Sequence, residues 1–391
     1  MSDALDRCVG DTGHFFDSVL SREHLYRPGA FDGQTAPVTV EEIDDCVTGR
    51  PLSVDCVRIA KDNRLLDAKY YRAEVGENYA GPRDVIDPVK VARLIDAGAT
   101  LVIRPASLYL PRLRRFCKEI EMRLGHGVDA DVFVTPPNSR GFEIHSDAAE
   151  SLAIQLVGTK DWTLYEPVHP WEQRSFGVTP PDGLTAIAEY TVAPGDFLYV
   201  PRGMPHLVRT TDTMSVHVTI SVNTARWSDL LTALVKAALS APAFQGPVPM
   251  GESVSSVIRK ELAEHVDRLA AAVRRLGSAE DAVEQVLRSG DGMLDAVRTG
   301  LITQLVEGAN LTALDRIQLR PGTWPVIRSA ERGAQITVGR NNFQVAQLAA
   351  TACALVMAGP AYVKDLAERE EDAIRAAKTL LDHGIAERCT D

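Results

Sequence analysis

The segment that decides the fold runs from Asp131 to Pro167 and reads DVFVTPPNSRGFEIHSDAAESLAIQLVGTKDWTLYEP. Within it, one residue separates His145 from Asp147, so on an extended chain both side chains leave the same face. An apolar run, then Gly158 and Thr159, then a second alternating run predict a β-hairpin. A His-x-Asp pair on a strand is more often a solvated polar pair, so a metal site needs a third ligand from elsewhere.

A second stretch, Pro194–His206, supplies that ligand and reads PGDFLYVPRGMPH. Pro-Gly-Asp predicts a turn, the four apolar residues after it a short strand, and Pro201 with Gly203 a second turn that brings His206 onto the next strand. Two His and one carboxylate on one face of a metal leave neighbouring positions open for a cosubstrate and O2, as in non-haem Fe(II) enzymes. The sequence therefore predicts a metal site made of His145, Asp147 and His206.

The chain resembles the JmjC-type 2-oxoglutarate oxygenases, and within them the ribosomal oxygenases, which hydroxylate His or Arg side chains of ribosomal proteins. The motifs that carry the resemblance follow the order of that family: TPPNSRGF at 135–142, HSD at 145–147, QLVGTKDW at 155–162, the Pro194–His206 stretch and HVTIS at 217–221. The resemblance implies that His145, Asp147 and His206 are the Fe(II) ligands. It also implies that Lys160 pairs with the distal carboxylate of 2-oxoglutarate, a role that suits its charge, and that His217 lines the same pocket.

Two positions depart from the family pattern. The family often has Asn where this chain has Asp131, at a position that helps to hold the cosubstrate. An anion there would repel a carboxylate unless it is protonated or turned away. The family also often has Tyr where this chain has Phe133, at a position that faces the substrate. The resemblance therefore places Asp131 in the cosubstrate site and Phe133 in the substrate pocket, with changed contacts at both.

The predicted fold is mixed α+β. Short strands with antiparallel patterning, punctuated by Gly and Pro, predict a double-stranded β-helix of the jelly-roll or cupin type, the JmjC core. Before it, Thr39 and Glu42 form a capping box for a helix at 40–47, and Asp87 with Pro88 begins a second helix. The predicted domains are the catalytic domain at 1–226, a helical domain at 227–320 and a winged-helix-like domain at 321–391.

The helical domain carries apolar residues at steps of three and four from 254 to 276, and the pattern continues at 281–287 and 294–306. Such a stripe must be covered, and in the resembled family this region mediates dimerisation, so we expect a homodimer. In the last domain, 336–338 reads as strand, and 343–357 and 372–381 as helices. Residues 364–391 carry five basic and eight acidic side chains, which disfavours phosphate and indicates a structural or protein-contact module.

Composition limits the remaining possibilities. The six Cys among 391 residues lie far apart without a Cys-x-x-Cys pair, which argues against a disulfide framework and a structural zinc site. The N-terminal residues lack the features of a secretory signal, and the longest near-apolar run is too short to cross a bilayer, so we expect a cytoplasmic protein without a membrane partner. The net charge of -11 disfavours nucleic acid and favours a basic partner.

These observations predict an Fe(II)- and 2-oxoglutarate-dependent oxygenase that uses O2, hydroxylates a His or Arg side chain of a ribosomal protein or other peptide, and releases succinate and CO2. One alternative is a hydroxylase of a peptide or small molecule in a biosynthetic pathway. Another is a cupin metalloenzyme that does not use 2-oxoglutarate, for which Glu150 occupies the usual place of an extra carboxylate ligand.

Overall fold

The structure is a computed structural model of the chain, and the account below covers residues 3–74, 76, 80–140, 142–167, 174–177, 182–248, 254–277, 310–320, 323, 325–330, 332–338 and 341–389. The predicted helical segments at 281–287 and 294–306 lie outside these residues. The chain divides into two compact units, one made mainly of residues up to Asn223 and one mainly of residues from Thr224 on.

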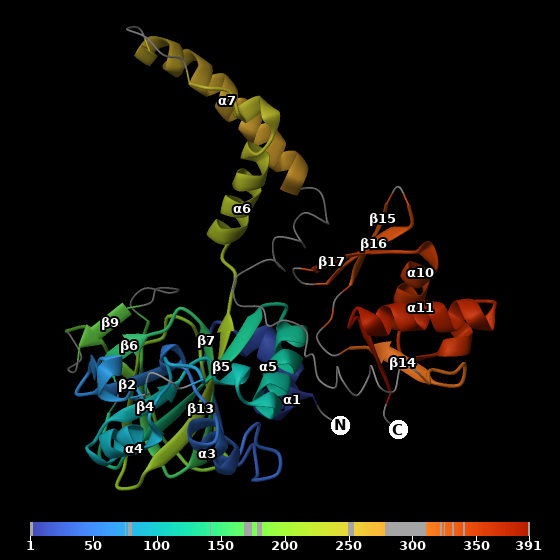
Figure 1. The fold of residues 1–391 in the computed structure, drawn as a ribbon. Coiled ribbons are helices and arrows are strands. Elements are labelled where there is room, and N and C mark those ends of the chain that lie inside the picture. The colour runs from blue at the N-terminus through green and yellow to red at the C-terminus, as the bar shows by residue number, and fades with distance from the viewer. Residues whose placement is uncertain are drawn as a thin grey trace. The chain divides into compact units, whose positions relative to one another are not determined.

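The first unit is built on two antiparallel sheets (Figure 1). The larger has the order β1-β11-β7-β13-β5-β4-β2-β3, and the smaller β10-β8-β12-β6-β9. Their strands are β1 (Leu25–Arg27), β2 (Val57–Lys61), β3 (Arg64–Leu65), β4 (Thr100–Ile103), β5 (Gly127–Thr135), β6 (Ile144–Ser146), β7 (Glu150–Val157), β8 (Lys160–Tyr165), β9 (Arg174–Gly177), β10 (Ala186–Val192), β11 (Phe197–Val200), β12 (His206–Thr210) and β13 (Ser215–Asn223). This confirms a mixed α+β fold with antiparallel sheets.

Side-chain alternation decides what each face of the larger sheet carries. On β5, Val128, Ala130 and Val132 are fully buried in the main hydrophobic cluster, which also contains residues of the N-terminal helices. The odd-numbered residues between them point to the other face, where Phe133 stacks on His217 of the neighbouring β13. One face of the sheet therefore makes the core, and the opposite face is left for polar and aromatic side chains.

Helices cover the core face: α1 (Ala4–Val9), α2 (Thr12–His14), α3 (Val40–Thr48), α4 (Pro88–Asp96) and α5 (Pro111–Leu124), with a π-helical turn at Phe15–Val19 and 3-10 turns at Val54–Cys56, Ala68–Tyr70 and Ala106–Leu108. The predicted capping box is present, because Thr39 Oγ1 accepts from the Glu42 amide at 3.3 Å and Glu42 accepts from the Thr39 amide at 2.8 Å. Asp87 caps α4, whose first residue is Pro88, which confirms the second helix start.

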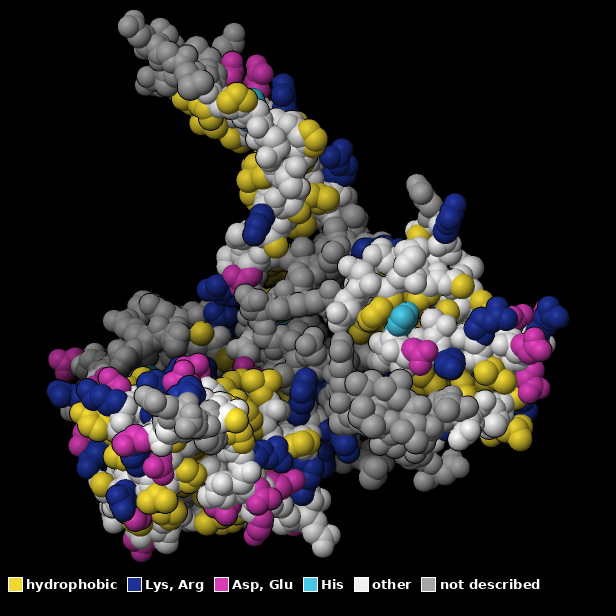
Figure 2. Space-filling view, in the orientation of Figure 1, with side chains coloured by type: hydrophobic (Ala, Val, Ile, Leu, Met, Phe, Trp, Pro, Cys, Tyr) yellow, Lys and Arg dark blue, Asp and Glu magenta, His cyan; other side chains and the backbone are white. Residues whose placement is uncertain are grey.

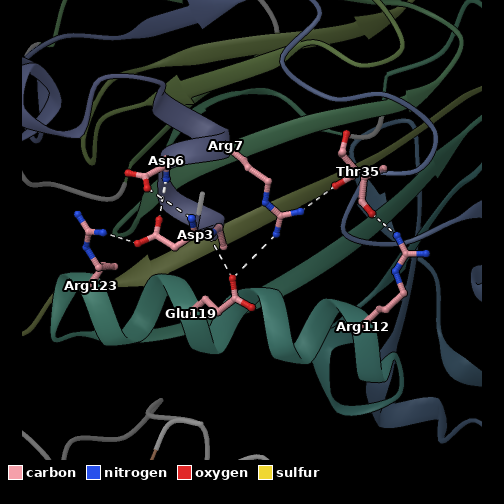
Figure 3. A network of polar contacts seen from close by, with 9 residues as sticks. Asp3, Asp6, Arg7, Thr35, Arg112, Glu119 and Arg123 are labelled. Atoms are coloured by element: carbon pink, nitrogen blue, oxygen red, sulfur yellow. Dashed lines mark hydrogen bonds and ion pairs between the residues drawn. The ribbon is translucent and has the colours of Figure 1, made fainter. Parts of the chain in front are cut away.

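A polar network fastens α1 to α5 (Figure 3). The Ala4 amide donates to Glu119 at 3.1 Å, Arg7 pairs with the same carboxylate, and Arg123 pairs with Asp3. Leu5 and the other buried residues of α1 belong to the main hydrophobic cluster. The N-terminal segment is therefore an integral layer of the first unit.

The second unit contains α6 (Trp227–Leu239), a 3-10 turn at Pro242–Phe244, α7 (Val254–Gly277), β14 (Arg316–Leu319), β15 (Val326–Ser329), β16 (Ala334–Val338), β17 (Asn341–Val345), α10 (Gln347–Met357), β18 (Ala361–Tyr362), a 3-10 turn at Val363–Leu366, α11 (Glu370–Asp382) and β19 (Ala386–Arg388). Two three-stranded sheets, β18-β14-β19 and β15-β16-β17, accompany α10 and α11. The prediction of a helix from residue 343 was wrong at its start: residues 343–345 belong to β17, which pairs with β16, and α10 begins at Gln347. In the described part of the chain, none of the helices combines the length and apolar character that crossing a bilayer requires.

Candidate metal centre

The three predicted ligands meet on the smaller sheet. His145 on β6 and His206 at the start of β12 are directly paired across the two strands, and Asp147 follows β6 immediately. Asp147 carboxylate oxygens lie 3.8 Å from His145 Nε2 and 3.7 Å from His206 Nε2. One ligand atom from each side chain falls within 4.8 Å of the other two, and no other such group of three occurs among the residues described above. Two nitrogens and one oxygen at these distances fit a single divalent ion of the kind bound by two His and a carboxylate.

The orientation of both imidazoles is fixed by the backbone. His145 Nδ1 donates to the Glu143 carbonyl oxygen at 2.7 Å, and His206 Nδ1 donates to the Met204 carbonyl oxygen at 3.1 Å. These bonds assign the proton to Nδ1, so both Nε2 lone pairs are directed to the shared point. Burial lowers the pKa of His206 to about 4, assisted by the neighbouring His145 imidazole. His206 is therefore neutral near pH 7, as a metal ligand must be.

A tight turn carries His206 into place. The Gly203 amide donates to the Asp147 carbonyl oxygen at 2.9 Å, and the Met204 amide donates to the Pro201 carbonyl oxygen at 3.1 Å. Gly203 has a φ of +82°, which favours glycine. The turn predicted from Pro201 and Gly203 is thus present. Its hydrogen bond to the Asp147 carbonyl connects the backbone of this ligand to the segment that leads into His206.

A buried ammonium group lies on β8, in the sheet that also carries the predicted ligands. With Thr135 and His217 it forms what we call the Lys160 corner. Lys160, the first residue of β8, is 5% exposed, and its Nζ donates to Thr135 Oγ1 at 3.1 Å and to His217 Nδ1 at 3.0 Å. Burial lowers the pKa of Lys160 to about 7, and the pKa of His217 is lowered by burial and by Lys160. The structure therefore brings Lys160 and His217 together as expected. The sequence assigned no role to Thr135, although it lies two residues beyond Phe133 on β5 and so shares its face.

Aromatic rings line the space between the ligands and this corner. Phe133 stacks on His217 with ring centroids 4.6 Å apart, and Phe142 meets Phe133 edge-on at 6.5 Å. Phe142 also contacts the ligand His145 edge-on at 6.1 Å and is 37% exposed, which places it at a solvent-facing edge of the site. Trp162 stacks on His206 at 5.6 Å. Phe133 thus sits beside the predicted cosubstrate pocket, and Phe142 is a rim residue that the sequence did not single out.

Asp131 is held apart from the Lys160 corner. It lies on the same face of β5 as Thr135 but four residues earlier, which corresponds to about 13 Å along a strand. Its Oδ2 lies 3.4 Å from Arg104 Nε, and its Oδ1 is buried without a hydrogen-bond partner among the described residues. Burial raises the pKa of Asp131 to about 7, with Arg104 acting in the opposite direction. Arg104 was not anticipated, because 26 residues separate it from Asp131 in the sequence and only the pairing of β4 with β5 brings them together.

Glu150 does not take part in the metal site. Its neighbour Ser151 has its Oγ 3.5 Å from Asp147 Oδ2, so alternation along β7 directs Glu150 to the opposite face. There it is buried and accepts hydrogen bonds from Tyr199 and Ser21. The cupin alternative therefore loses the extra carboxylate ligand that the sequence offered it.

Comparison with known proteins found a matching family model, several similar proteins and solved structures of the same fold. The model of the JmjC domain family matches residues 106–230. The bifunctional lysine-specific demethylase and histidyl-hydroxylase NO66 of Drosophila willistoni is 39% identical over 130 residues, which is 32% of this chain and 17% of that protein. Human ribosomal oxygenase 1 is 32% identical over 162 residues, covering 39% of this chain and 25% of its own length. The chain thus spans well under half of these curated relatives.

Among solved structures, the crystal structure of Escherichia coli ycfD aligns with a TM-score of 0.58, at 12% identity, over 97% of this chain and 98% of that one. The Escherichia coli ribosomal oxygenase YcfD in complex with cobalt and 2-oxoglutarate aligns with a TM-score of 0.54, also at 12% identity, over the same shares of the two chains. At that identity the likeness establishes a shared fold. The JmjC domain family model thus matches residues 106–230, within a fold that the chain shares with the ribosomal oxygenase of Escherichia coli.

Proposed function

We propose that this chain is an Fe(II)- and 2-oxoglutarate-dependent oxygenase that hydroxylates a basic side chain, His or Arg, of a ribosomal protein. The observation that carries the proposal is the convergence of His145, Asp147 and His206 on one point, with both Nε2 atoms and the carboxylate turned toward it. When bound there, iron would supply the oxidising chemistry by which O2 and 2-oxoglutarate become succinate, CO2 and a hydroxyl group on the substrate. The three side chains leave neighbouring coordination positions free for these reactants.

The corner made by Lys160, Thr135 and His217 supports 2-oxoglutarate as the cosubstrate. Lys160 offers a buried ammonium and Thr135 a hydroxyl, and burial lowers the pKa of Lys160. A carboxylate that entered this corner would form a charge-assisted hydrogen bond and would restore the charge that burial disfavours. These residues would thereby anchor the far end of a dicarboxylate whose other end reaches the metal.

Asp131 supports a basic substrate. Its buried carboxylate has one oxygen without a hydrogen-bond partner in the described structure, and its other oxygen meets Arg104, whose side chain is 65% exposed. A guanidinium or imidazolium group can satisfy such a carboxylate, whereas a second carboxylate would be repelled. We therefore assign Asp131 to the substrate side of the site, in place of the cosubstrate contact expected from the sequence. Phe142, at the solvent-facing rim beside His145, would contact the same substrate.

Names of the relatives support a ribosomal substrate. Proteins called ribosomal oxygenase and histidyl-hydroxylase are similar to part of this chain. The JmjC family model matches residues 106–230, which include His145, Asp147 and His206. The net charge of -11 also favours a basic partner of the ribosomal kind over nucleic acid or a membrane. We further propose a cytoplasmic location, where such a partner is synthesised.

We propose that residues 227–320 form a helical dimerisation domain and residues 321–391 a winged-helix-like module that contacts protein. Apolar side chains on α6 and α7 are exposed (Figure 2), with Trp227 at 80% and Leu262 and Val266 more than half exposed. Light scattering of the full chain should give a dimer mass, and Leu262→Asp with Val266→Asp should give a monomer. The control Leu65→Asp changes an equally exposed residue on β3 and should leave the dimer intact. A monomer mass for the unmodified chain would refute the dimer.

The test of the enzyme is a reaction of the apo chain with Fe(II), 2-oxoglutarate and individual ribosomal proteins. We expect succinate to form in proportion to a mass gain of one oxygen atom on one ribosomal protein, and N-oxalylglycine to inhibit both. Binding of N-oxalylglycine without modification of any ribosomal protein would favour a biosynthetic peptide or small molecule as substrate. Metal binding without binding of N-oxalylglycine would favour the cupin alternative.

A further inference from the structure

A buried polar cluster lies behind the metal site, on the core face of the larger sheet. We call it the Glu150 hub and define it as Ser21, Glu150, Tyr199 and the backbone amide of Arg202. Glu150, 1% exposed, accepts from Ser21 Oγ at 2.6 Å, from Tyr199 OH at 2.6 Å and from the Arg202 amide at 3.1 Å. The Ser21 amide in turn donates to Tyr199 OH at 2.8 Å. The hub thus joins the N-terminal segment, β7, β11 and the turn that follows β11.

The hub is adjacent in sequence to two of the three ligands. Glu150 follows Asp147 by three residues, and Arg202 precedes His206 by four. The turn at 201–205 therefore has two external anchors: the Glu150 carboxylate accepts from the Arg202 amide, and the Asp147 carbonyl accepts from the Gly203 amide at 2.9 Å. Between them, these anchors fix where the chain enters β12. His206 is the first residue of β12 and follows this turn directly.

The conformation of Ser21 indicates that the hub is maintained at a cost. Ser21 has a φ of +60°, in the left-handed region, which residues with a side chain rarely adopt. In this conformation both its amide and its hydroxyl reach the hub, one to Tyr199 and one to Glu150. Strained backbone persists where surrounding contacts determine it, and such positions concentrate at functional sites.

We propose that Glu150 is a positioning residue for the metal site: it holds the turn at 201–205 so that His206 faces Asp147, and through Ser21 it makes metal affinity depend on the N-terminal segment. The proposal rests on the proposed function in one respect, that His145, Asp147 and His206 bind a divalent metal. Outer contacts that orient metal ligands typically change metal affinity by about 10- to 100-fold when removed. Because Glu150 acts through one turn of backbone, we expect the lower end of that range.

The test measures the affinity of the full-length apo chain for Co(II), by its visible absorption, together with the melting temperature. Glu150→Gln keeps the shape of the side chain but replaces one acceptor oxygen with a donor group that faces O–H and N–H donors. We expect Co(II) binding to weaken about tenfold, with a changed absorption spectrum. Ser21→Ala and Tyr199→Phe each remove one hydroxyl of the hub and should weaken Co(II) binding in the same direction by a smaller factor.

The matched control is Glu121→Gln. Glu121 is also a fully buried carboxylate of the first unit, where it pairs with the buried Lys118 and accepts from the Val128 amide at 3.3 Å. It lies on α5, away from the strands that carry the ligands. We expect this change to lower the melting temperature and to leave Co(II) affinity and spectrum unchanged. Equal Co(II) affinities for the Glu150 and Glu121 variants, measured where both are folded, would overturn the positioning role. If Glu150→Gln does not fold, the Ser21 and Tyr199 variants decide by the same comparison.

A separate variant distinguishes failure of this inference from failure of the metal site. His206→Ala should abolish Co(II) binding in the otherwise unchanged chain. If the unmodified chain and His206→Ala bind Co(II) equally, the metal site itself is wrong. If His206→Ala loses binding while every hub variant keeps it, the metal site stands and the role of Glu150 is refuted.

Discussion

His145 and His206 face each other across paired positions of β6 and β12, with ring centroids 4.4 Å apart. Each ring is held by a hydrogen bond from Nδ1 to the backbone carbonyl two residues before it. The sheet therefore fixes both imidazoles before any metal arrives. Two imidazoles that are already oriented lose little conformational entropy when a metal binds. Replacing Asp147 should leave both rings in place, so the change in metal affinity measures the contribution of Asp147.

Replacing Asp147 with Ala should reduce Co(II) affinity by at least about 100-fold, because loss of a direct ligand exceeds the loss of an outer contact. The variant should also lose 2-oxoglutarate turnover, while its melting temperature changes little because Asp147 is half-buried and follows the strand. Asp161→Ala removes an exposed carboxylate of β8 and serves as the control. Full turnover in Asp147→Ala would refute the ligand assignment.

The pH dependence of 2-oxoglutarate binding should report on Lys160. Its pKa near 7 means that the free chain carries the ammonium below that pH and the neutral amine above it. Affinity for 2-oxoglutarate should therefore be constant below pH 7 and fall about tenfold per unit above it. Lys160→Met should weaken binding by about 10- to 100-fold, the range for a hydrogen bond to a charged group, and remove the pH dependence. A pH-dependent affinity that survives in Lys160→Met would assign the titration to another group.

Lys160 should also affect how the free energy of unfolding depends on pH. Between pH 7 and its ordinary pKa of 10.5, Lys160 binds more protons in the unfolded chain than in the folded chain. The contribution of Lys160 to the free energy of unfolding should therefore rise with pH across this window. Buried thiols such as Cys8 and Cys117, whose pKa burial raises, act in the opposite direction, so the comparison is with Lys160→Met, which keeps them. In denaturant titrations at pH 7.5 and 9.5, the free energy of unfolding of the unmodified chain should increase relative to that of Lys160→Met. An equal change in both proteins would mean that Lys160 keeps an ordinary pKa in the folded state.

Local sequence signals predicted the elements that depend on local contacts. The capping box at Thr39 and Glu42 and the start at Asp87 and Pro88 act within one helical turn, and both are present. The proximity of His145 and His206 was also predicted. The His-x-Asp pair needed a third ligand, and the turn at Pro201 and Gly203 indicated that His206 would supply it.

What the sequence did not reveal depends on pairing between distant strands. Arg104 reaches Asp131 only because β4 pairs with β5, and Glu150 faces away from the metal because of the register of β7. Residues 343–345 have apolar content that suits the helix after them, yet pairing with β16 makes them a strand. These outcomes are set by contacts among segments that no local pattern identifies.

The hairpin turn before Lys160 should tolerate no side chain at Gly158. Gly158 has a φ of +63°, and a Cβ there would lie 2.0 Å from the Met214 carbonyl oxygen. Gly158→Ala should therefore destabilise the chain by more than the roughly 1–2 kcal/mol that left-handed backbone costs a residue with a side chain. Gly125→Ala is the matched control, since Gly125 has a φ of +70° with nothing within 4 Å of its Cβ position. Equal losses of unfolding free energy in the two variants would show that the Met214 carbonyl can move aside.

Asp131→Asn separates a substrate contact from a cosubstrate contact. Asparagine keeps the shape of the side chain but removes the charge that a guanidinium or imidazolium would meet. We expect kcat/KM for a basic ribosomal substrate to fall at least about tenfold, in line with the 1.5–3 kcal/mol of a charged hydrogen bond. Because the pKa of Asp131 is about 7, this loss should be largest above pH 7, where the unmodified carboxylate is ionised.

Affinity for 2-oxoglutarate supplies the decisive comparison for the same variant. Asp131 lies about 13 Å along β5 from the Thr135 that Lys160 contacts, so the dissociation constant for 2-oxoglutarate should stay unchanged. Lys160→Met, which should change 2-oxoglutarate binding alone, is the reciprocal control. If Asp131→Asn instead strengthens 2-oxoglutarate binding and leaves kcat/KM for the protein substrate unaltered at saturating cosubstrate, the carboxylate acts on the cosubstrate and not on a basic side chain.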